Sequence, residues 1–567
     1  MNKLNGAEAM VRMLQAHGVR HIFGLCGDTS LPLYDALATL DHGMQHILTR
    51  DERSAAYMAD AYARVSGRVG VCEGPSGGGA TYILPGIVEA NESSIPVLGI
   101  TTDIATTSRG RYTLTELDQK ALFRPLTKWN AVIDRADRLP ETVRAAFRAM
   151  TTGKPGAAHL ALPFDTQKDV AVDPGDIWAQ PEHATYPAWR TAPDPSAVEA
   201  AATAILSARQ PLFVCGGGVV IAGAASALAA VAGRLGAAVA TTISGQGSLP
   251  EDHPLCVGVV GSNGGTLPTR AVVEQAELVV FIGCRAGSVT TERWRFPTKG
   301  TRIVHIDADP QVIGAIYRTE VALVGDAKLA LQALDAQIAE RLRQSATPRP
   351  TGNGAELVAR AKREKFSAFD RLAQSSETQV LPEKLVSTLH EVLPRDAVVV
   401  CDPGTPCPYF SAYYPFLESG RHFISNRAHG ALGYSMSGAI GAHFGRPQAK
   451  CVSVMGDGSF GFTSGELETI VRLNLPIMMI VVSNSVFGWI KAGQKTGFKE
   501  RYFSVDFSRT NHAQVAEAFG VKSWRVSDPA QLKAAFAAAA EHGGPTLVDV
   551  LTQPLHEANA PVSEWVA

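Results

Sequence analysis

One short segment and one distant asparagine carry the chemistry that this 567-residue sequence predicts most directly: Gly456-Asp457-Gly458-Ser459 and Asn484. Each follows an apolar run, Cys451 to Met455 and Ile477 to Val482. Such runs are typical of buried parallel strands, so we expect Asp457 and Asn484 at the tips of two neighbouring strands, where open α/β sheets bind ligands. A carboxylate and an amide oxygen suit Mg²⁺, a hard cation that usually keeps phosphate oxygens among its ligands. The spacing therefore predicts a magnesium ion beside a bound diphosphate.

A plain turn is the alternative interpretation, because Gly-Asp-Gly alone is a common turn sequence. A helical pattern lies between the two apolar runs, with Leu467, Ile470, Val471 and Asn474 on one face. The order strand, helix, strand, with the asparagine at the correct end, favours the ligand site. The glycines would let the backbone approach a diphosphate closely.

Glu52 is the second candidate for chemistry. It precedes a predicted helix, Ala55 to Arg64, and so lies at the N-terminus of that helix. A lone glutamate at this position is more often a capping or dipole-matching residue than a catalytic one. Its role therefore depends on the longer pattern around it.

Composition and charge are those of an ordinary globular protein, with 46% apolar and 19% charged residues. The formal net charge of −2 gives no reason to expect nucleic acid or an anionic membrane as a partner. No stretch approaches the roughly 20 apolar residues that span a bilayer, and the N-terminus is typical of an amphipathic helix, not of a signal peptide. The 8 cysteines include no CxxC pair, which indicates reduced, mostly buried thiols. We therefore expect a cytoplasmic protein.

Two stretches rich in proline or glycine, 166–195 and 345–356, indicate linkers between domains. The segments between them alternate strand-like and helical patterns, as parallel α/β domains do. We predict three doubly wound parallel-sheet domains at 1–170, 190–342 and 360–567. The middle one is Rossmann-like, and the similar sizes hint at an ancient internal duplication.

The Gly-Asp-Gly segment with its later asparagine resembles the thiamine diphosphate signature. In that superfamily a glutamate about fifty residues from the N-terminus is followed by a helix reading A-x-x-A-D/E-G/A-Y-A-R and by a glycine-rich turn. Ala56 to Arg64 and Ser76 to Thr81 match these features after Glu52. The match runs from end to end, and the chain resembles the acetolactate synthase/pyruvate oxidase/oxalyl-CoA decarboxylase group, with acetolactate synthase the closest pattern. The resemblance implies pyrimidine-binding, central Rossmann-like and diphosphate-binding domains, in that order.

The resemblance also implies roles for single residues. Glu52 would hydrogen-bond N1′ of the aminopyrimidine, Leu432 would support the bent cofactor from below, and Asp457, Asn484 and the Val486 carbonyl would hold Mg²⁺. The cofactor-binding residues that it implies are Glu52, Gly27, Ser76, Gly77, Leu432, Gly456, Asp457, Gly458, Ser459, Asn484, Val486, Phe487 and Gly488. The candidate catalytic residues are Glu52, Thr115 and His429. For Thr115 and His429, a place behind the site or on the surface is an equally good interpretation.

Several positions depart from the acetolactate synthase pattern. Asp51 stands where those enzymes usually have histidine, and Thr115 stands where they have an active-site glutamine. Glu116-Leu117-Asp118-Gln119 resembles a segment of oxalyl-CoA decarboxylase. Arg285-Ala286-Gly287 replaces the Arg-Phe-Asp that contacts flavin. FAD, ADP, CoA or no ligand in the central domain are therefore all open.

We predict a thiamine diphosphate- and Mg²⁺-dependent lyase or carboligase that acts on a small-molecule 2-oxo acid or related acyl donor. We expect a homodimer or homotetramer with active sites at the subunit interface. One alternative is a decarboxylase or lyase of an acyl-CoA, resembling oxalyl-CoA decarboxylase or 2-hydroxyacyl-CoA lyase. A nucleotide-binding oxidoreductase is a second, but Gly216-Gly217-Gly218 is too short a fingerprint for it. A catalytically silent relative is a third, and the presence of Glu52 argues against it.

Overall fold

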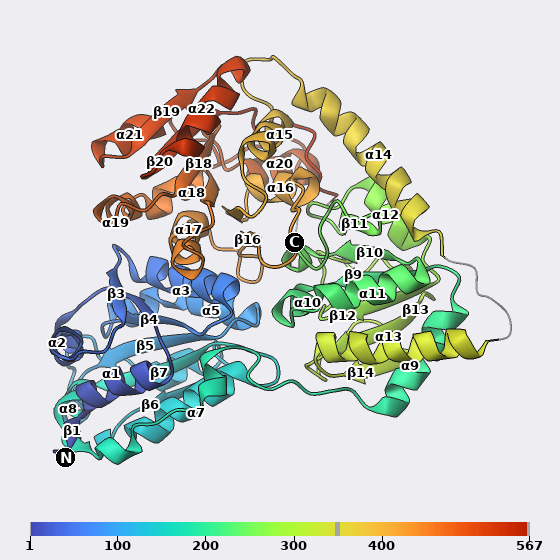
Figure 1. Ribbon diagram of the computed structural model, residues 1–567. Coiled ribbons are helices and arrows are strands. Elements are labelled where there is room, and N and C mark those ends of the chain that lie inside the picture. The colour runs from blue at the N-terminus through green and yellow to red at the C-terminus, as the bar shows by residue number, and fades with distance from the viewer. Residues whose placement is uncertain (1, 346–351, 564–567) are drawn as a thin grey trace. The chain divides into compact units, whose positions relative to one another are not determined.

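The structure is a computed structural model, and it describes residues 2–345 and 352–563. These residues form two compact units. Unit 1 comprises the residues up to 189 together with 426–451 and 462–477, and unit 2 comprises 190–425, 452–461 and the residues from 478 onward. One six-stranded sheet organises unit 1, and two organise unit 2 (Figure 1).

The sheet of unit 1 is parallel and has the order β3-β2-β4-β5-β7-β6. Its strands are β2 (His21–Gly24), β3 (Gln45–Leu48), β4 (Gly70–Gly74), β5 (Val97–Asp103), β6 (Trp129–Val132) and β7 (Ala158–Pro163). Helices α1 (Gly6–Ala16), α2 (Leu31–Thr39) and α7 (Leu139–Thr151) cover one face, and α3 (Glu52–Ser66) and α5 (Leu84–Glu92) cover the other (Figure 1). Because both faces are covered, every residue of β4, β5 and β7 is buried.

Helix α3 carries Glu52 at its first position. Asp51 caps the helix by accepting a hydrogen bond from the Arg53 N–H at 2.8 Å, and Gly67 ends it at φ 69°. Helix α17 (Tyr434–Gly445) packs along α3. A Cβ at Gly441 of α17 would lie 2.0 Å from the Met58 carbonyl oxygen, so this close approach requires glycine.

The first sheet of unit 2 has the order β11-β10-β9-β12-β13-β14. Its strands are β9 (Pro211–Cys215), β10 (Ala238–Thr241), β11 (Cys256–Val259), β12 (Leu278–Ile282), β13 (Arg302–Asp307) and β14 (Val321–Val324). Counted along the chain this is 3-2-1-4-5-6, the order of the Rossmann fold. Helices α9 (Pro195–Ser207), α11 (Ala225–Leu235) and α13 (Ala327–Gln344) pack on one face, and α12 (Leu267–Glu274) and α14 (Gly354–Ala373) pack on the other.

The second sheet of unit 2 has the order β16-β15-β17-β18-β20-β19. Its strands are β15 (Val398–Cys401), β16 (Phe423–Ser425), β17 (Cys451–Gly456), β18 (Met478–Ser483), β19 (Lys522–Val526) and β20 (Thr546–Leu551). Helices α15 (Pro382–Val392), α16 (Pro406–Tyr413) and α22 (Pro529–Glu541) pack against it. Counted along the chain its order is 2-1-3-4-6-5, and the sheet of unit 1 has the same order. The Rossmann-like sheet has a different strand order. A duplication that produced the first and the third sheet along the chain would leave the strand order that these two share.

The predicted α/β class with parallel sheets is confirmed. One element differs from the pattern: two short helices, α18 (Asp457–Thr463) and α19 (Glu466–Arg472), replace a continuous one, and Asn474 lies beyond them at φ 47°. Asparagine adopts this left-handed conformation readily. The predicted domain limits stay predictions, and 346–351 of the second predicted linker lie outside the described residues. Within the described ranges, no helix combines the length and the apolar character that a membrane crossing needs.

Candidate functional site

Asp457 and Asn484 lie at the carboxyl ends of neighbouring strands, as the sequence predicts. Strands β17 and β18 pair in parallel, with Gly456 opposite Val482. One Asp457 carboxylate oxygen, Oδ2, accepts hydrogen bonds from the main-chain N–H groups of Asn484 at 2.8 Å and Ser485 at 2.6 Å. The other, Oδ1, accepts from the Gly458 N–H at 2.9 Å. Asp457 therefore fixes the loop that follows β18, in which Ser485 has φ 60°.

The side chain of Asn484 has the opposite character. Its amide oxygen and nitrogen are both buried, and neither has a hydrogen-bond partner among the described residues. Buried amides are nearly always satisfied, so an unpaired buried amide beside a carboxylate is typical of a ligand-binding site. The described ranges contain no group of three or more His, Cys, Asp and Glu side chains that could hold a metal. A cation here would therefore need amide, carbonyl or phosphate oxygens, and this donor set fits Mg²⁺ with a diphosphate.

Burial raises the pKa of Asp457, and the N–H groups of Ser485, Asn484 and Gly458 oppose that rise. A bound cation would favour the ionised form further. Beneath the loop, Ser483 Oγ donates to Asp549 Oδ1 at 2.5 Å and lies 3.0 Å from His512 Nδ1. No local sequence pattern indicates this buried support, because 66 residues separate Ser483 from Asp549.

The other predicted residues of this edge pack tightly around the loop. A Cβ at Gly458 would lie 2.6 Å from the Phe487 ring, so glycine at this position leaves room for the ring as it lies in the structure. Gly488 begins α20 (Gly488–Gly497), and Val486 forms a bridge with Asp506. Ser459 is buried in α18.

Glu52 is 7% exposed, so its carboxyl group lies in the protein interior. Its Cγ lies 3.3 Å from where a Cβ at Gly74 would be, and its Oε1 lies 3.1 Å from the corresponding point at Gly79. Side chains at these glycines would crowd the carboxyl group. Burial is the main cause that raises the pKa of Glu52, and the charges of Asp51 and Glu73 add to it. The group is therefore poised to hold or exchange a proton closer to neutrality than an ordinary glutamate.

Three predicted residues of unit 1 meet at the end of β4. Ser76 Oγ lies 2.7 Å from Thr115 Oγ1, and a Cβ at Gly77 would lie 2.7 Å from the Thr115 Cβ. Thr115 itself is exposed and has φ 68°. Gly27, in the loop after β2, packs on Pro75, where a Cβ would lie 2.4 Å from the proline Cβ. The two loops flank the point where the strand order reverses, which is where doubly wound sheets bind ligands.

His429 and Leu432 lie in the segment that leads to α17. The side chain of His429 is exposed and that of Leu432 is half-buried. Gly430 and Gly433 have φ values of 74° and 86°, so the backbone around Leu432 turns in left-handed conformations. Asn426 Nδ2 donates to the Ala431 carbonyl at 2.6 Å and holds the middle of the segment.

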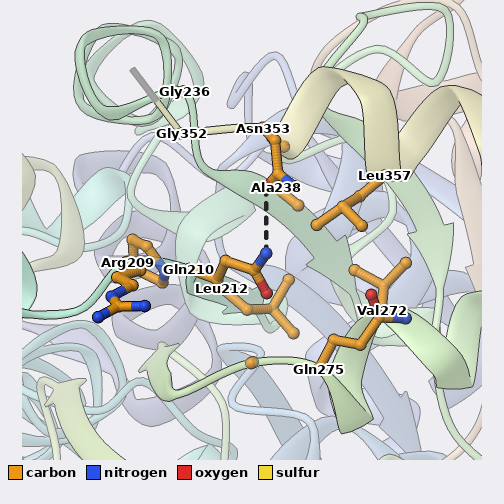
Figure 2. A pocket seen from close by; sticks show the side chains of 13 residues that line it. Arg209, Gln210, Leu212, Gly236, Ala238, Val272, Gln275, Gly352, Asn353 and Leu357 are labelled. Carbon is orange, nitrogen blue, oxygen red and sulfur yellow. Dashed lines mark hydrogen bonds between the residues drawn. The ribbon is translucent and has the colours of Figure 1, made fainter. Parts of the chain in front are cut away.

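The central sheet shows a different arrangement at its own reversal point. The N–H groups of Gly216 and Gly218 donate to the carbonyls of Ile282 and Gly283 at 2.9 and 3.1 Å, so these two groups already have acceptors. A small depression, shown in Figure 2, lies at the other end of these strands, where β9 and β10 begin. Apolar side chains such as Leu212, Val272 and Leu357 line much of it, and Gln210 Nε2 donates to Asn353 Oδ1 at 3.4 Å.

Three family models cover most of the chain. The N-terminal TPP binding domain of thiamine pyrophosphate enzymes matches residues 4–122, the central domain matches 198–334, and the C-terminal TPP binding domain matches 402–550. Thiamine pyrophosphate is thiamine diphosphate. The chain belongs to the thiamine pyrophosphate enzyme family. Its two outer sheets are therefore those of the TPP-binding domains, and thiamine diphosphate is its cofactor.

Relatives of this thiamine diphosphate enzyme narrow the reaction type. A probable acetolactate synthase large subunit of Methanocaldococcus jannaschii is 34% identical over 97% of this chain and 92% of its own length. That of Methanococcus aeolicus is 32% identical over the same shares. Acetolactate synthase isozyme 3 large subunit of Escherichia coli is 29% identical over 95% of this chain and 93% of its own. The enzyme is thus of the carboligase and lyase type, and these relatives do not favour the acyl-CoA alternative.

Proposed function

We propose that this enzyme uses thiamine diphosphate with Mg²⁺ to break or form a carbon–carbon bond next to the carbonyl of a 2-oxo acid. The observation that carries the magnesium site is the buried, unpartnered amide of Asn484 beside Asp457. The 2-oxo acid rests on the relatives, whose names describe synthases of acetolactate. Thiamine diphosphate, when bound, would supply the nucleophile and the electron sink that this bond breaking or bond formation needs.

Asp457, the Asn484 amide oxygen and the Val486 carbonyl would hold the cation against the diphosphate. Asp457 Oδ2 accepts hydrogen bonds from the main-chain N–H groups of Asn484 and Ser485. These bonds would hold the loop after β18 in place before the cation binds. Gly456, Gly458 and Ser459 would lie along the diphosphate, where the lack of side chains on the glycines permits close approach.

Glu52 would hold a proton at its carboxyl oxygen and exchange it with N1′ of the aminopyrimidine ring. Its burial and raised pKa support this role, because a proton-transfer group works best when its pKa lies near the operating pH. Gly27, Ser76 and Gly77 would line the pyrimidine pocket at the reversal point of the first sheet.

Substrate-facing roles fall to Thr115 and His429. The Thr115 hydroxyl joins a hydrogen-bonded chain with Ser76 and Thr29, which holds its orientation. The His429 side chain is exposed and would face the substrate, where its ring nitrogens would donate or accept hydrogen bonds. Leu432 would support the cofactor from below.

We further propose a homodimer or homotetramer in which copies of the chain share active sites, and a cytoplasmic location. The assembly rests on the family resemblance. All 8 cysteines are free thiols and only Cys26 is exposed, which supports a reducing compartment. For the central domain we propose that no dinucleotide binds at the reversal point, because the N–H groups of Gly216 and Gly218 have acceptors there.

Calorimetric titration with thiamine diphosphate, with and without Mg²⁺, tests the proposal. We expect binding that requires the metal, followed by CO₂ or aldehyde release from a panel of 2-oxo acids, diketones and acyl-CoAs. Thiamine diphosphate binding with the same affinity in the absence of Mg²⁺ would overturn the proposed metal site. Turnover of acyl-CoAs and of no 2-oxo acid would overturn the proposed substrate class.

A further inference from the structure

A buried ionic cluster joins three helices of unit 1. Arg64 on α3 donates through Nε to Asp60 Oδ2 at 2.8 Å and through Nη2 to Glu89 Oε1 at 2.9 Å. Tyr434, the first residue of α17, donates its hydroxyl to Asp60 Oδ2 at 2.5 Å. The side chains of Asp60 and Glu89 are fully buried, and that of Arg64 is 4% exposed. Two carboxylates thus share one guanidinium in the interior.

Glu89 has four hydrogen-bond donors, two on each oxygen. Oε1 accepts from Arg64 and from Ser93 Oγ, the latter at 2.7 Å. Oε2 faces the segment before α17 and accepts the main-chain N–H groups of Ala428 at 3.1 Å and His429 at 2.7 Å. The side chains of Ala428 and His429 are exposed, so a buried carboxylate holds the backbone of an exposed segment.

This anchoring matters because the same segment contains two glycines. Gly430 and Gly433 flank Ala431 and Leu432, and glycine costs the most entropy to hold in one conformation. The hydrogen bond from Asn426 to the Ala431 carbonyl restrains one point, and Glu89 restrains another.

We propose that Glu89 is a positioning residue for the segment Ala428 to Leu432, and that it sets where His429 and Leu432 lie in the active site. The proposal rests on the proposed function, which places those two residues against the cofactor and substrate. The contact needs the two acceptor oxygens of the Glu89 carboxylate and not only a side chain of this size. Glutamine offers one acceptor oxygen and one donor NH₂, so it must turn a donor toward either Arg64 or the two N–H groups.

Amide hydrogen exchange of the cofactor-free protein, resolved to single residues by mass spectrometry with electron-transfer fragmentation, tests the contact. In the wild-type protein we expect the Ala428 and His429 amides to exchange about 10- to 100-fold more slowly than unprotected amides, the range for hydrogen bonds to a charged group. Glu89→Gln should remove this protection without changing exchange in the strands of the sheet. Ser93→Ala is the matched control: it removes a donor from Oε1 but leaves Oε2, and should keep the protection.

Kinetics of the loaded enzyme separate positioning from general stability. Glu89→Gln should lower kcat about 10-fold or more and leave the dissociation constant of thiamine diphosphate within about 2-fold, because the diphosphate and metal residues lie elsewhere. Ser93→Ala should keep kcat within about 2-fold.

Unprotected amides in the wild type would overturn the contact, and this measurement stands even where Glu89→Gln does not fold. Lost protection with unchanged kcat would overturn the positioning role. A wild-type protein that shows the protection but binds no thiamine diphosphate would instead overturn the proposed function and leave the contact intact.

Discussion

Replacing Asn484 by alanine should stabilise the cofactor-free protein and strongly weaken its stabilisation by the cofactor. Both amide atoms are buried without a partner among the described residues, and an unsatisfied buried polar group costs about 1–3 kcal/mol. Asn484→Ala removes that cost and loses little packing, so we expect the free energy of unfolding without ligand to rise by about 1 kcal/mol. For an unfolding unit of 150–250 residues this corresponds to about 2–4 °C in Tm.

Mg²⁺ and thiamine diphosphate should reverse the order of stability of the wild type and Asn484→Ala. Saturation at 100 times Kd stabilises a protein by about 2.7 kcal/mol, and a variant that binds about 100-fold more weakly gains only about 0.4 kcal/mol at the same concentration. In the presence of Mg²⁺ and thiamine diphosphate the wild type should therefore be the more stable protein.

Asp457→Asn is the matched control, and its effect without ligand should have the opposite sign. The Asp457 carboxylate accepts three main-chain N–H groups, and an amide in its place must turn its own NH₂ toward at least one of them. We expect a loss of about 1.5–3 kcal/mol without ligand, the range for hydrogen bonds to a charged group.

Thermal and urea unfolding of the three proteins, with and without Mg²⁺ and thiamine diphosphate, supply the measurement. A lower ligand-free midpoint for Asn484→Ala, together with an unchanged metal-dependent shift, would show that the amide is an ordinary packing group and not a cation ligand.

Three further results are expected. Glu52→Gln should keep the fold but lose activity by about 10²-fold or more, the scale of a positioned proton-transfer group; unchanged C2–H/D exchange of the bound cofactor by NMR would point to another residue. Burial lowers the pKa of His159 to about 3, whereas the unfolded chain takes up the proton near 6.5, so the unfolded state binds more protons within that window and stability falls as the pH drops through it. His159→Gln should therefore reduce the stability lost between pH 7 and pH 4 by about 3 kcal/mol in urea titrations, and an unchanged slope would contradict this assignment. Co-refolding of Glu52→Gln with Asp457→Ala subunits should restore activity if copies share sites, and inactive mixed dimers verified by mass spectrometry would place both groups on one chain.

Local patterns in the sequence determined the elements and the candidate residues. The apolar runs Cys451 to Met455 and Ile477 to Val482 predicted two strands, which the structure shows as β17 (Cys451–Gly456) and β18 (Met478–Ser483), because a strand buried on both faces needs such a run. Asp457 and Asn484 were predicted at neighbouring strand tips because parallel strands place their carboxyl ends at one edge, and the structure confirms that placement. Their roles, and that of Glu52, stay predictions, since spacing shows where a side chain lies and not what it binds.

Contacts between distant residues were decided by the tertiary structure alone. The Glu89 side chain is fully buried and accepts a hydrogen bond from the His429 N–H, 340 residues away, and no local pattern in the sequence indicates that partner. The shared order of the two outer sheets is likewise invisible in periodicity, because neighbouring strands are chosen by the packing of the whole sheet. The periodicity of apolar residues predicts whether a residue is buried or exposed. Which distant residue it contacts depends on how segments far apart in the sequence pack together.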